Sequence, residues 1–407
     1  MKYRFIFLIL VCLAAMINLA ADWPQFLGPQ RNSTSIETGL LQTWDAKGPP
    51  VLWQKDIGEG YSSPVVAGER LVLFHRLGDE EIVECLNAAS GKEIWKHREA
   101  TNYSDPLGKG DGPRSTPLIA GEHVYTLSPG GRLLCLKLAN GTKIWQRELL
   151  QDYNVPPSYF GVGTSPILES GWLLVNVGGR NAGIVAFDPD SGKEVWKATP
   201  DGASYASPVA ADIDGVRHVV FFTRQGIVSL DPASGNVRFS KRWRSRMDAS
   251  VNAASPVVIG DCLFFTACYE TGAILVRAKK DALDEIWSND RSLSCHFSTP
   301  VYHEGYLYGF DGRQESGTEF RCIEAKTGKV CWSKEGFGCG SMIWAEGHLI
   351  VLSEGGELVL IECTSAKYRE KARAAVLMGP CRAHMALANG RLYARDNRKL
   401  VCWNLKK

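Results

Sequence analysis

The sequence has almost no net charge and, beyond its N-terminus, no long hydrophobic run, and these two shortages exclude several classes of protein. Its 46 Lys and Arg residues against 44 Asp and Glu leave a net charge of +2. That is too little for the positive field that drives non-specific nucleic-acid binding. No later segment approaches the roughly 20 continuous apolar residues of a membrane-spanning helix. We expect no nucleic-acid partner and no transmembrane segment.

The common signatures of catalysis are also missing. The chain contains no nucleophile elbow, no Walker loop, no HExxH and no CxxC motif. His296 with Asp248 or Asp111 could supply an acid and a base, but the sequence does not bring them within hydrogen-bond reach. We therefore expect no catalytic residue and no metal site.

Residues 1–21 have the form of a secretory signal peptide, with Lys2 and Arg4 before a short apolar run and small residues before Asp22. The protein is thus predicted to be exported, to the periplasm or the cell exterior. Eleven cysteines remain after residue 21, and four of them fill one small apolar slot of a repeat, which predicts core thiols: Cys85, Cys135, Cys322 and Cys402. A bridge between Cys339 and Cys381, in equivalent loops of successive units, is left open.

What the sequence has in abundance is a repeated phrase. "LNAASGKEIW", residues 86–95, has Gly at its sixth and an aromatic residue at its tenth place, and close copies end at Trp145, Trp196, Phe239 and Trp332. Upstream of the phrases lies a small residue followed by Pro, spaced 42 to 53 residues apart, at Pro64, Pro117, Pro166, Pro208, Pro256 and Pro300. Two decayed copies carry Met342 and Met385 in the Pro slot, which makes eight units.

Each unit alternates with period two and is broken by glycine turns, so that four short antiparallel strands fit it. Such units at this spacing are typical of propeller blades. We predict an all-β fold, a single eight-bladed β-propeller of four-stranded antiparallel blades over residues 49–407. Residues 49–57, with Trp53, are predicted to complete the last blade and close the ring, and residues 22–48 to form an N-terminal extension packed on the propeller.

These motifs resemble the PQQ-like β-propeller repeat family, which includes quinoprotein alcohol dehydrogenases and BamB-type barrel-assembly proteins. The resemblance covers residues 23–407, from "DWPQFLGP" to "GRLYARDNRKLVCWNL". It implies the fold but leaves the activity open. The dehydrogenases are known for two adjacent cysteines over the quinone, and some carry a haem domain. Here no two cysteines adjoin, no C-x-x-C-H is present and "DIDG" at 212 is a lone acidic turn, so we expect no cofactor, with PQQ as the alternative.

The loops that precede each Pro slot should gather around one mouth of the central channel. Aromatic and cationic residues alternate there, which suits a small anionic or sugar-like ligand or a segment of a partner protein. The candidate binding residues are Tyr61, Arg114, Tyr159, Tyr205, Arg246, Asn252, His296, Arg382 and His384. The plainer interpretation, that these groups only satisfy loop carbonyls and one another, stays open.

The function that the sequence favours is an exported, monomeric, non-catalytic binding or scaffold protein of BamB type, acting through its channel-mouth loops. A PQQ-dependent dehydrogenase with an atypical site is the first alternative. A carbohydrate-binding or carbohydrate-cleaving propeller is the second.

Overall fold

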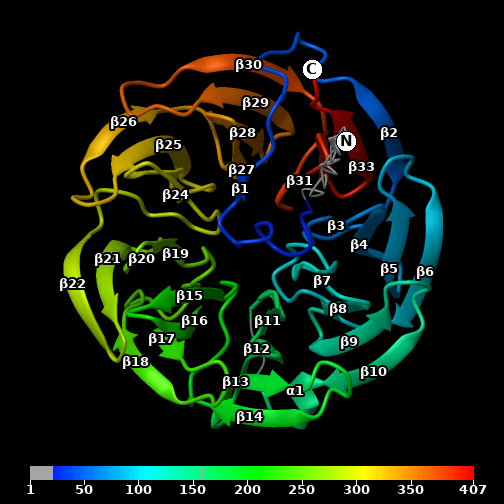
Figure 1. Ribbon diagram of the computed structural model, residues 1–407, viewed down its shortest axis with the longest axis vertical. Coiled ribbons are helices and arrows are strands. Elements are labelled where there is room, and N and C mark those ends of the chain that lie inside the picture. The colour runs from blue at the N-terminus through cyan, green and yellow to red at the C-terminus, as the bar shows by residue number, and fades with distance from the viewer. Residues whose placement is uncertain (1–21, 157–158) are drawn as a thin grey trace, which may run out of the picture.

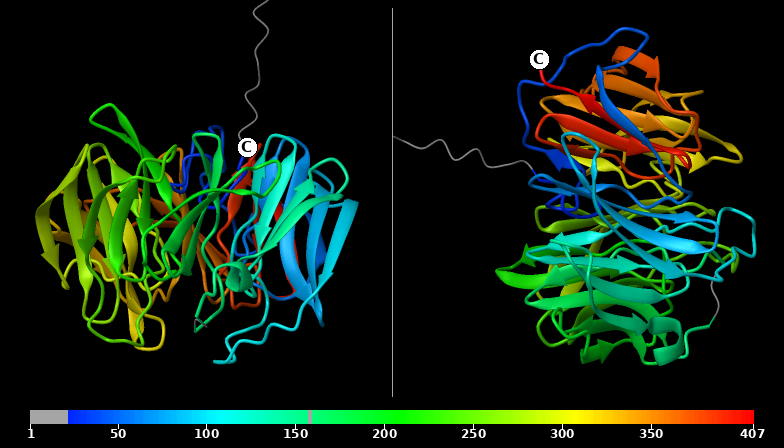
Figure 2. Two further views of the ribbon diagram at one scale, coloured as in Figure 1. Left: turned by 90° about the horizontal axis from the view of Figure 1, so that it is seen from below. Right: turned by 90° about the vertical axis from the view of Figure 1, so that its right-hand side faces the viewer.

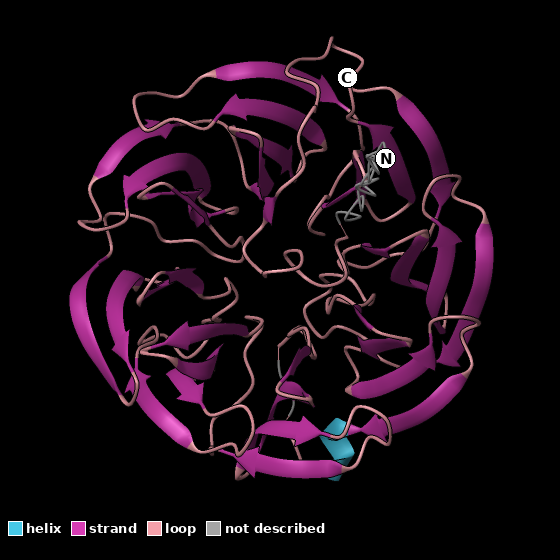
Figure 3. Ribbon diagram, in the orientation of Figure 1, coloured by secondary structure: helices cyan, strands magenta, loops and turns pink. Residues whose placement is uncertain are grey.

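The computed structural model describes residues 22–156 and 159–407, and its regular structure is almost entirely β. In these residues there are 33 strands and one four-residue helix, α1 (Leu149–Asp152). The strands form eight sheets placed around a central axis (Figures 1 and 3). The prediction of an eight-bladed propeller with four-stranded antiparallel blades is confirmed. No helix of the described residues has the length and hydrophobicity needed to cross a bilayer.

The strands of each blade follow one another from the axis outward. Blades 1 to 4 comprise β3 (Val65–Ala67), β4 (Arg70–Leu77), β5 (Glu80–Asn87) and β6 (Glu93–Ala100); β7 (Leu118–Ala120), β8 (His123–Leu127), β9 (Arg132–Lys137) and β10 (Lys143–Glu148); β11 (Ile167–Glu169), β12 (Trp172–Gly179), β13 (Ala182–Phe187) and β14 (Glu194–Ala198); and β15 (Val209–Ile213), β16 (Val216–Phe222), β17 (Gly226–Leu230) and β18 (Val237–Arg242).

Blades 5 to 8 repeat this order, with two additions from the N-terminal part of the chain. They comprise β19 (Val257–Ile259), β20 (Cys262–Ala267), β21 (Gly272–Lys279) and β22 (Ala282–Asn289); β23 (Val301–His303), β24 (Tyr306–Arg313), β25 (Gly317–Glu324) and β26 (Val330–Lys334); β1 (Thr34–Ser35), β27 (Gly340–Ala345), β28 (His348–Ser353), β29 (Glu357–Glu362) and β30 (Glu370–Ala375); and β31 (Ala386–Ala388), β32 (Arg391–Arg395), β33 (Lys399–Asn404) and β2 (Val51–Asp56).

The Gly and the Trp of the repeated phrase meet across blade boundaries. Trp145 of blade 2 donates its indole N–H to the carbonyl of Pro189 in blade 3, at 2.9 Å. A Cβ atom added to Gly192, whose φ is +68°, would lie 2.6 Å from the Trp145 ring. The same pairing joins Trp53 to Gly91, Trp95 to Gly141, Trp196 to Gly235 and Trp287 to Gly328. The Gly is required both by the left-handed turn and by the Trp ring of the preceding blade, which packs against it. The phrase is repeated because each blade packs against the preceding blade through this contact.

A belt of hydroxyl groups joins the inner strands of neighbouring blades. Backbone N–H groups immediately before the Pro slots donate to the Ser or Thr hydroxyl at the same place in the next blade. Each N–H donates to the hydroxyl of the next residue in the series Ser63, Thr116, Ser165, Ser207, Ser255 and Thr299, at 3.2, 2.9, 2.9, 3.0 and 2.9 Å in turn. The N–H of His384 donates to the Ser63 hydroxyl at 2.8 Å. These residues were predicted only to be small, yet their hydroxyls also satisfy backbone donors that the short inner strands leave unpaired.

The ring closes where β2, from the N-terminal part of the chain, becomes the outer strand of blade 8. Strand β2 pairs antiparallel with β33, in the register Trp53 to Cys402, as predicted. Strand β2 also contacts blade 1, because its Lys55 lies 3.0 Å from the buried carboxylate of Glu84. Lys96 of blade 1 contacts the same carboxylate at 3.1 Å. A hydrogen bond from His75 and these two lysine contacts hold the pKa of Glu84 well below its usual value despite burial. The seam between the two ends of the chain is therefore held by charge as well as by backbone pairing.

The segment 22–37 enters the channel and closes it. Trp23 exchanges two backbone hydrogen bonds of 2.8 Å with Val66 on the inner strand of blade 1. After a turn, β1 runs parallel to β27 of blade 7 and leads the chain out again. At the turn, the buried Arg31 guanidinium donates to the carbonyls of Pro166 and, at 2.6 Å, of Pro208. We call residues 22–37 the plug; Figure 1 shows them in dark blue across the centre of the ring.

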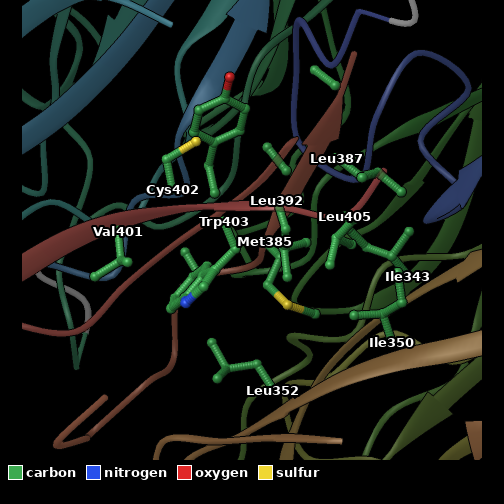
Figure 4. Close-up of a cluster of buried hydrophobic side chains, with 14 of the residues drawn as sticks. Ile343, Ile350, Leu352, Met385, Leu387, Leu392, Val401, Cys402, Trp403 and Leu405 are labelled. Carbon is green, nitrogen blue, oxygen red and sulfur yellow. The ribbon is translucent and has the colours of Figure 1, made fainter. Parts of the chain in front are cut away.

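The largest hydrophobic cluster lies where the plug meets blades 7, 8 and 1. Met385, Trp403 and Leu392 are fully buried there with Ile343 and Ile350 of blade 7 (Figure 4). Cys402 belongs to this cluster, as its slot in the repeat predicted.

The eleven cysteines of the described residues are all free thiols, and most of them are buried. Cys339 and Cys381 are among the buried ones, and burial raises the pKa of each to about 12. At neutral pH these two side chains therefore behave as small apolar groups.

Candidate binding site

A large cavity opens at one end of the propeller axis. This mouth face carries the loops from each outer strand to the next inner strand, together with the turn between the second and third strands of each blade. In Figure 2 (left) the loop after β6 lies on this face, opposite the C-terminus. The cavity has a volume of about 590 Å³. Phe26 of the plug forms part of its lining, so the plug bounds the cavity along the propeller axis.

The structure brings seven of the nine candidate binding residues into the lining of this cavity: Tyr61, Arg114, Tyr159, Tyr205, His296, Arg382 and His384. The other two lie elsewhere. Asn252 is buried behind the wall, where its amide donates to the carbonyl of Thr223 at 2.8 Å. Arg246 is exposed on the loop after β18, outside the lining. The sequence could place residues in a loop, but not decide which way each side chain points.

Tyr61 stands between two arginines on one side of the cavity. The guanidinium carbons of Arg114 and Arg382 lie 5.8 and 5.4 Å from the centre of its ring, within the range of a cation–π contact. Asp105 holds Arg114 at 3.1 Å and Glu354 holds Arg382 at 2.5 Å, both from behind the wall. The three side chains are thus fixed before any ligand arrives.

Two aromatic residues form the adjoining wall. The hydroxyl of Tyr205 accepts a hydrogen bond of 2.9 Å from the N–H of Phe160, and the two rings pack edge to face with centroids 5.6 Å apart. A Cβ atom on Gly163 would lie 2.8 Å from the Tyr205 ring. The glycine just before the Pro slot therefore lets this ring stand against the backbone.

His296 is held on the opposite wall with both ring nitrogens engaged. Its Nδ1 lies 2.7 Å from the amide oxygen of Gln314, and its Nε2 lies 2.7 Å from the Tyr269 hydroxyl. An amide oxygen only accepts, so Nδ1 carries the proton and Nε2 accepts from Tyr269. Burial lowers the pKa of His296, which keeps the ring neutral and makes it a poor general base.

The two carboxylates considered as partners of His296 do not join it. The Asp248 side chain is fully exposed and lies 3.6 Å from Arg244. Asp111 accepts a hydrogen bond of 2.7 Å from the N–H of Asp105 inside its own loop. Neither lines the cavity. The lining contains one carboxylate, Glu315, and the described part of the chain shows no group of three His, Cys, Asp or Glu side chains that could hold a metal ion.

Sequence reasoning missed the hairpins that supply part of this wall. Tyr269 lies in the turn between β20 and β21, and Arg313, Gln314 and Glu315 lie at the turn between β24 and β25. The second-to-third strand turns point to the same face as the loops before the Pro slots, so they should have been included. The guanidinium of Arg313 lies 4.7 Å from the centre of the Tyr269 ring.

The floor of the cavity is polar. It includes hydroxyl residues that lie on, or just before, the inner strands of four blades: Ser165, Ser207, Ser298, Thr299 and Ser341. His384 also lies there, 3.3 Å from the hydroxyl of Ser33 in the plug, and burial lowers its pKa to about 4. Its ring is therefore neutral at physiological pH.

The mouth face also has an apolar rim. Apart from Ile36 of the plug, the exposed large hydrophobic residues of the described chain form two groups. One group lies along strands of the blades, and the other lies on the mouth face. At the mouth they are Leu107, Tyr159, Met247 and Met378 in loops, with Leu77 at the end of β4. Met378 is 87% exposed. We call these five residues the rim.

Comparisons with known proteins agree with this architecture. A family model described as the outer membrane protein assembly factor BamB matches residues 31–154 and 78–315. The chain is 26% identical over 126 residues to quinohemoprotein alcohol dehydrogenase ADH IIB of Pseudomonas putida, covering 28% of this chain and 17% of that protein. It is 33% identical over 115 residues to BamB of Salmonella typhimurium, covering 25% of this chain and 26% of that protein.

The matched part therefore spans about a quarter or less of these curated relatives. The crystal structure of BamB from Moraxella catarrhalis superposes with a TM-score of 0.62 at 17% identity, over 86% of this chain and 97% of that one. At this identity the likeness concerns the fold alone.

Proposed function

The chain belongs to the PQQ-repeat family of the outer membrane protein assembly factor BamB, and on that premise we propose that it is an exported, non-catalytic scaffold that holds a partner protein at its channel mouth. The observation that carries the proposal is the apolar rim. Exposed apolar residues that gather on one face, around a rigid cavity, are typical of an interaction surface. The seven such residues on the outer strands are instead spread over six blades around the circumference.

The chemistry of the cavity favours binding over catalysis. His296 is neutral with both nitrogens engaged, and Arg114 and Arg382 are held by carboxylates behind the wall. A site of this kind is preorganised to recognise a ligand, but offers no free general base beside it.

The dehydrogenase alternative requires residues that hold a quinone and a divalent cation. A hard cation takes six or more oxygen ligands, whereas Glu315 is the one carboxylate of the lining. No two cysteines are adjacent in the sequence. The residues of this cavity therefore do not fit that group.

A site-specific cross-linking experiment tests the scaffold. A photoactivatable amino acid placed at Met247 or at Leu107 should yield the same protein adduct in cells, identified by mass spectrometry. At the matched control position Val195, exposed on the outer strand β14, the adduct should be absent. Equal adducts at Val195, or oxidation of alcohols by the purified protein supplied with PQQ and Ca²⁺, would overturn the proposal.

Export and the monomeric state are part of the proposal. Export rests on residues 1–21, which lie outside the described residues, and on membership of the BamB family. Cell fractionation should find the protein outside the cytoplasm with an N-terminus near Asp22, and light scattering should give a mass close to that of one chain.

A further inference from the structure

The cavity has a small excess of positive charge. Four cationic residues line it, Lys109, Arg114, Arg313 and Arg382, against three carboxylates: Glu315 in the lining, and Asp105 and Glu354 directly behind the wall. Beneath the floor, the guanidinium of Arg31 is buried against neutral partners among the described residues. Such a cavity attracts an anion, because positive groups with low-dielectric walls focus the field.

The rest of the lining suits a ring that bears hydroxyl groups. Tyr61, Tyr205, Tyr269 and Phe297 present aromatic surfaces, and the floor presents hydroxyls of the inner strands. Flat aromatic faces pack against the apolar C–H face of a sugar ring, while hydroxyls and amides bind the ring's own hydroxyls. A volume of about 590 Å³ is in the range of small-molecule sites, roughly 300–1,000 Å³.

One buried hydroxyl on this floor lacks a partner. Ser341 occupies in blade 7 the place that Thr299 occupies in blade 6, but the belt of N–H to hydroxyl bonds ends at Thr299. The Ser341 hydroxyl is buried and has no hydrogen-bond partner among the described residues. A buried polar group without a partner is costly. Since Ser341 lines the cavity, rotation about its Cα–Cβ bond would bring the hydroxyl to a ligand hydroxyl at the floor.

We propose that the cavity binds a sugar acid, that is, a pyranose ring carrying a carboxylate, such as a hexuronate. Its carboxylate lies toward Arg382 and Arg114, its ring lies against the aromatic wall, and its hydroxyls reach Ser341 and the Gln314 amide. This site goes beyond the scaffold function and does not depend on it, since the rim can hold a partner whatever fills the cavity.

Calorimetric titration of the purified protein tests the site. D-glucuronate and D-galacturonate should bind at least tenfold more tightly than D-glucose and D-galactose, a difference of about 1.4 kcal/mol. Arg382→Gln should remove that advantage, and Arg382→Lys should keep part of it because the charge remains. Arg246→Gln, an exposed arginine outside the cavity, is the matched control and should bind like the wild type. Ser341→Ala should weaken acid and neutral sugars alike, by about threefold.

Three results would each overturn the proposal. The first is a hexuronate that binds no more tightly than its neutral hexose. The second is benzoate binding more tightly than either hexuronate, which would assign the cavity to aromatic acids. The third is a folded Arg382→Gln protein, as judged by its thermal unfolding, that keeps the full preference for the acid. Cross-linking at Met247 is read separately, so failure of the sugar site and failure of the scaffold are distinguished.

Discussion

The pairing of Gly192 with Trp145 makes a quantitative prediction about how blades are joined. Gly192→Ala places a methyl group in a left-handed turn, at φ +68°, and 2.6 Å from the Trp145 ring. The backbone term is about 1 kcal/mol, and forcing a methyl group into a packed contact adds about 1–3 kcal/mol. We expect Gly192→Ala to lower the free energy of unfolding by about 3 kcal/mol.

The matched control separates the two terms. Gly121 lies in the turn between β7 and β8 with φ +57°, and a Cβ atom there would meet nothing within 4 Å. Gly121→Ala should therefore cost only the backbone term, about 1 kcal/mol. Both variants are compared with the wild type by urea denaturation followed by circular dichroism.

A double-mutant cycle then assigns the difference to the ring. In a Trp145→Leu background the flat ring is gone, so Gly192→Ala should fall to the cost of the control, about 1 kcal/mol. If Gly192→Ala is no worse than Gly121→Ala, or if its cost is unchanged in the Trp145→Leu background, the explanation of the repeated phrase is refuted.

Three further predictions concern other parts of the ring. Ser207→Ala leaves the N–H of Ser165 without its acceptor, so the free energy of unfolding should fall by about 1–3 kcal/mol in urea denaturation. Burial raises the pKa of Glu81 to about 7. Between about pH 4.5 and pH 7 this carboxyl group keeps its proton in the folded protein but loses it in the unfolded chain, so the free energy of unfolding falls as the pH rises through that range. Glu81→Gln should therefore raise the melting temperature at pH 8 more than at pH 5. Glu84→Gln removes the carboxylate that holds Lys55, and should destabilise the seam by about 2 kcal/mol and speed proteolysis near β2, whereas unchanged proteolysis would contradict the role of the charge.

Most of the fold could be predicted from the sequence because the pattern of one blade recurs eight times along the chain. The spacing of the Pro slots marked the blades, and an unpartnered strand around Trp53 marked the closure, since an open final sheet would leave an exposed edge. The plug was not readable in the same way. Residues 22–37 have no period, and their place is fixed by tertiary contacts such as those of Arg31 with two Pro carbonyls of blades 3 and 4.

The site was readable by position but not by orientation. Tyr205 and Asn252 both lie just before inner strands, yet the first turns its ring to the cavity and the second donates into the wall. A loop residue's direction depends on which backbone groups need a partner, and the carbonyl of Thr223 takes the Asn252 amide. The contribution of Tyr269 and Gln314 was missed because only one of the two kinds of loop on that face was considered.

The plug occupies part of the space along the axis of this propeller (Figure 1). Its Phe26 lines the cavity, its Arg31 donates to the carbonyls of Pro166 and Pro208, and its Ser33 hydroxyl lies 3.3 Å from the His384 ring. The N-terminal part of the chain therefore has two roles: β2 closes the ring by pairing with β33, and Phe26 of the plug helps to line the cavity.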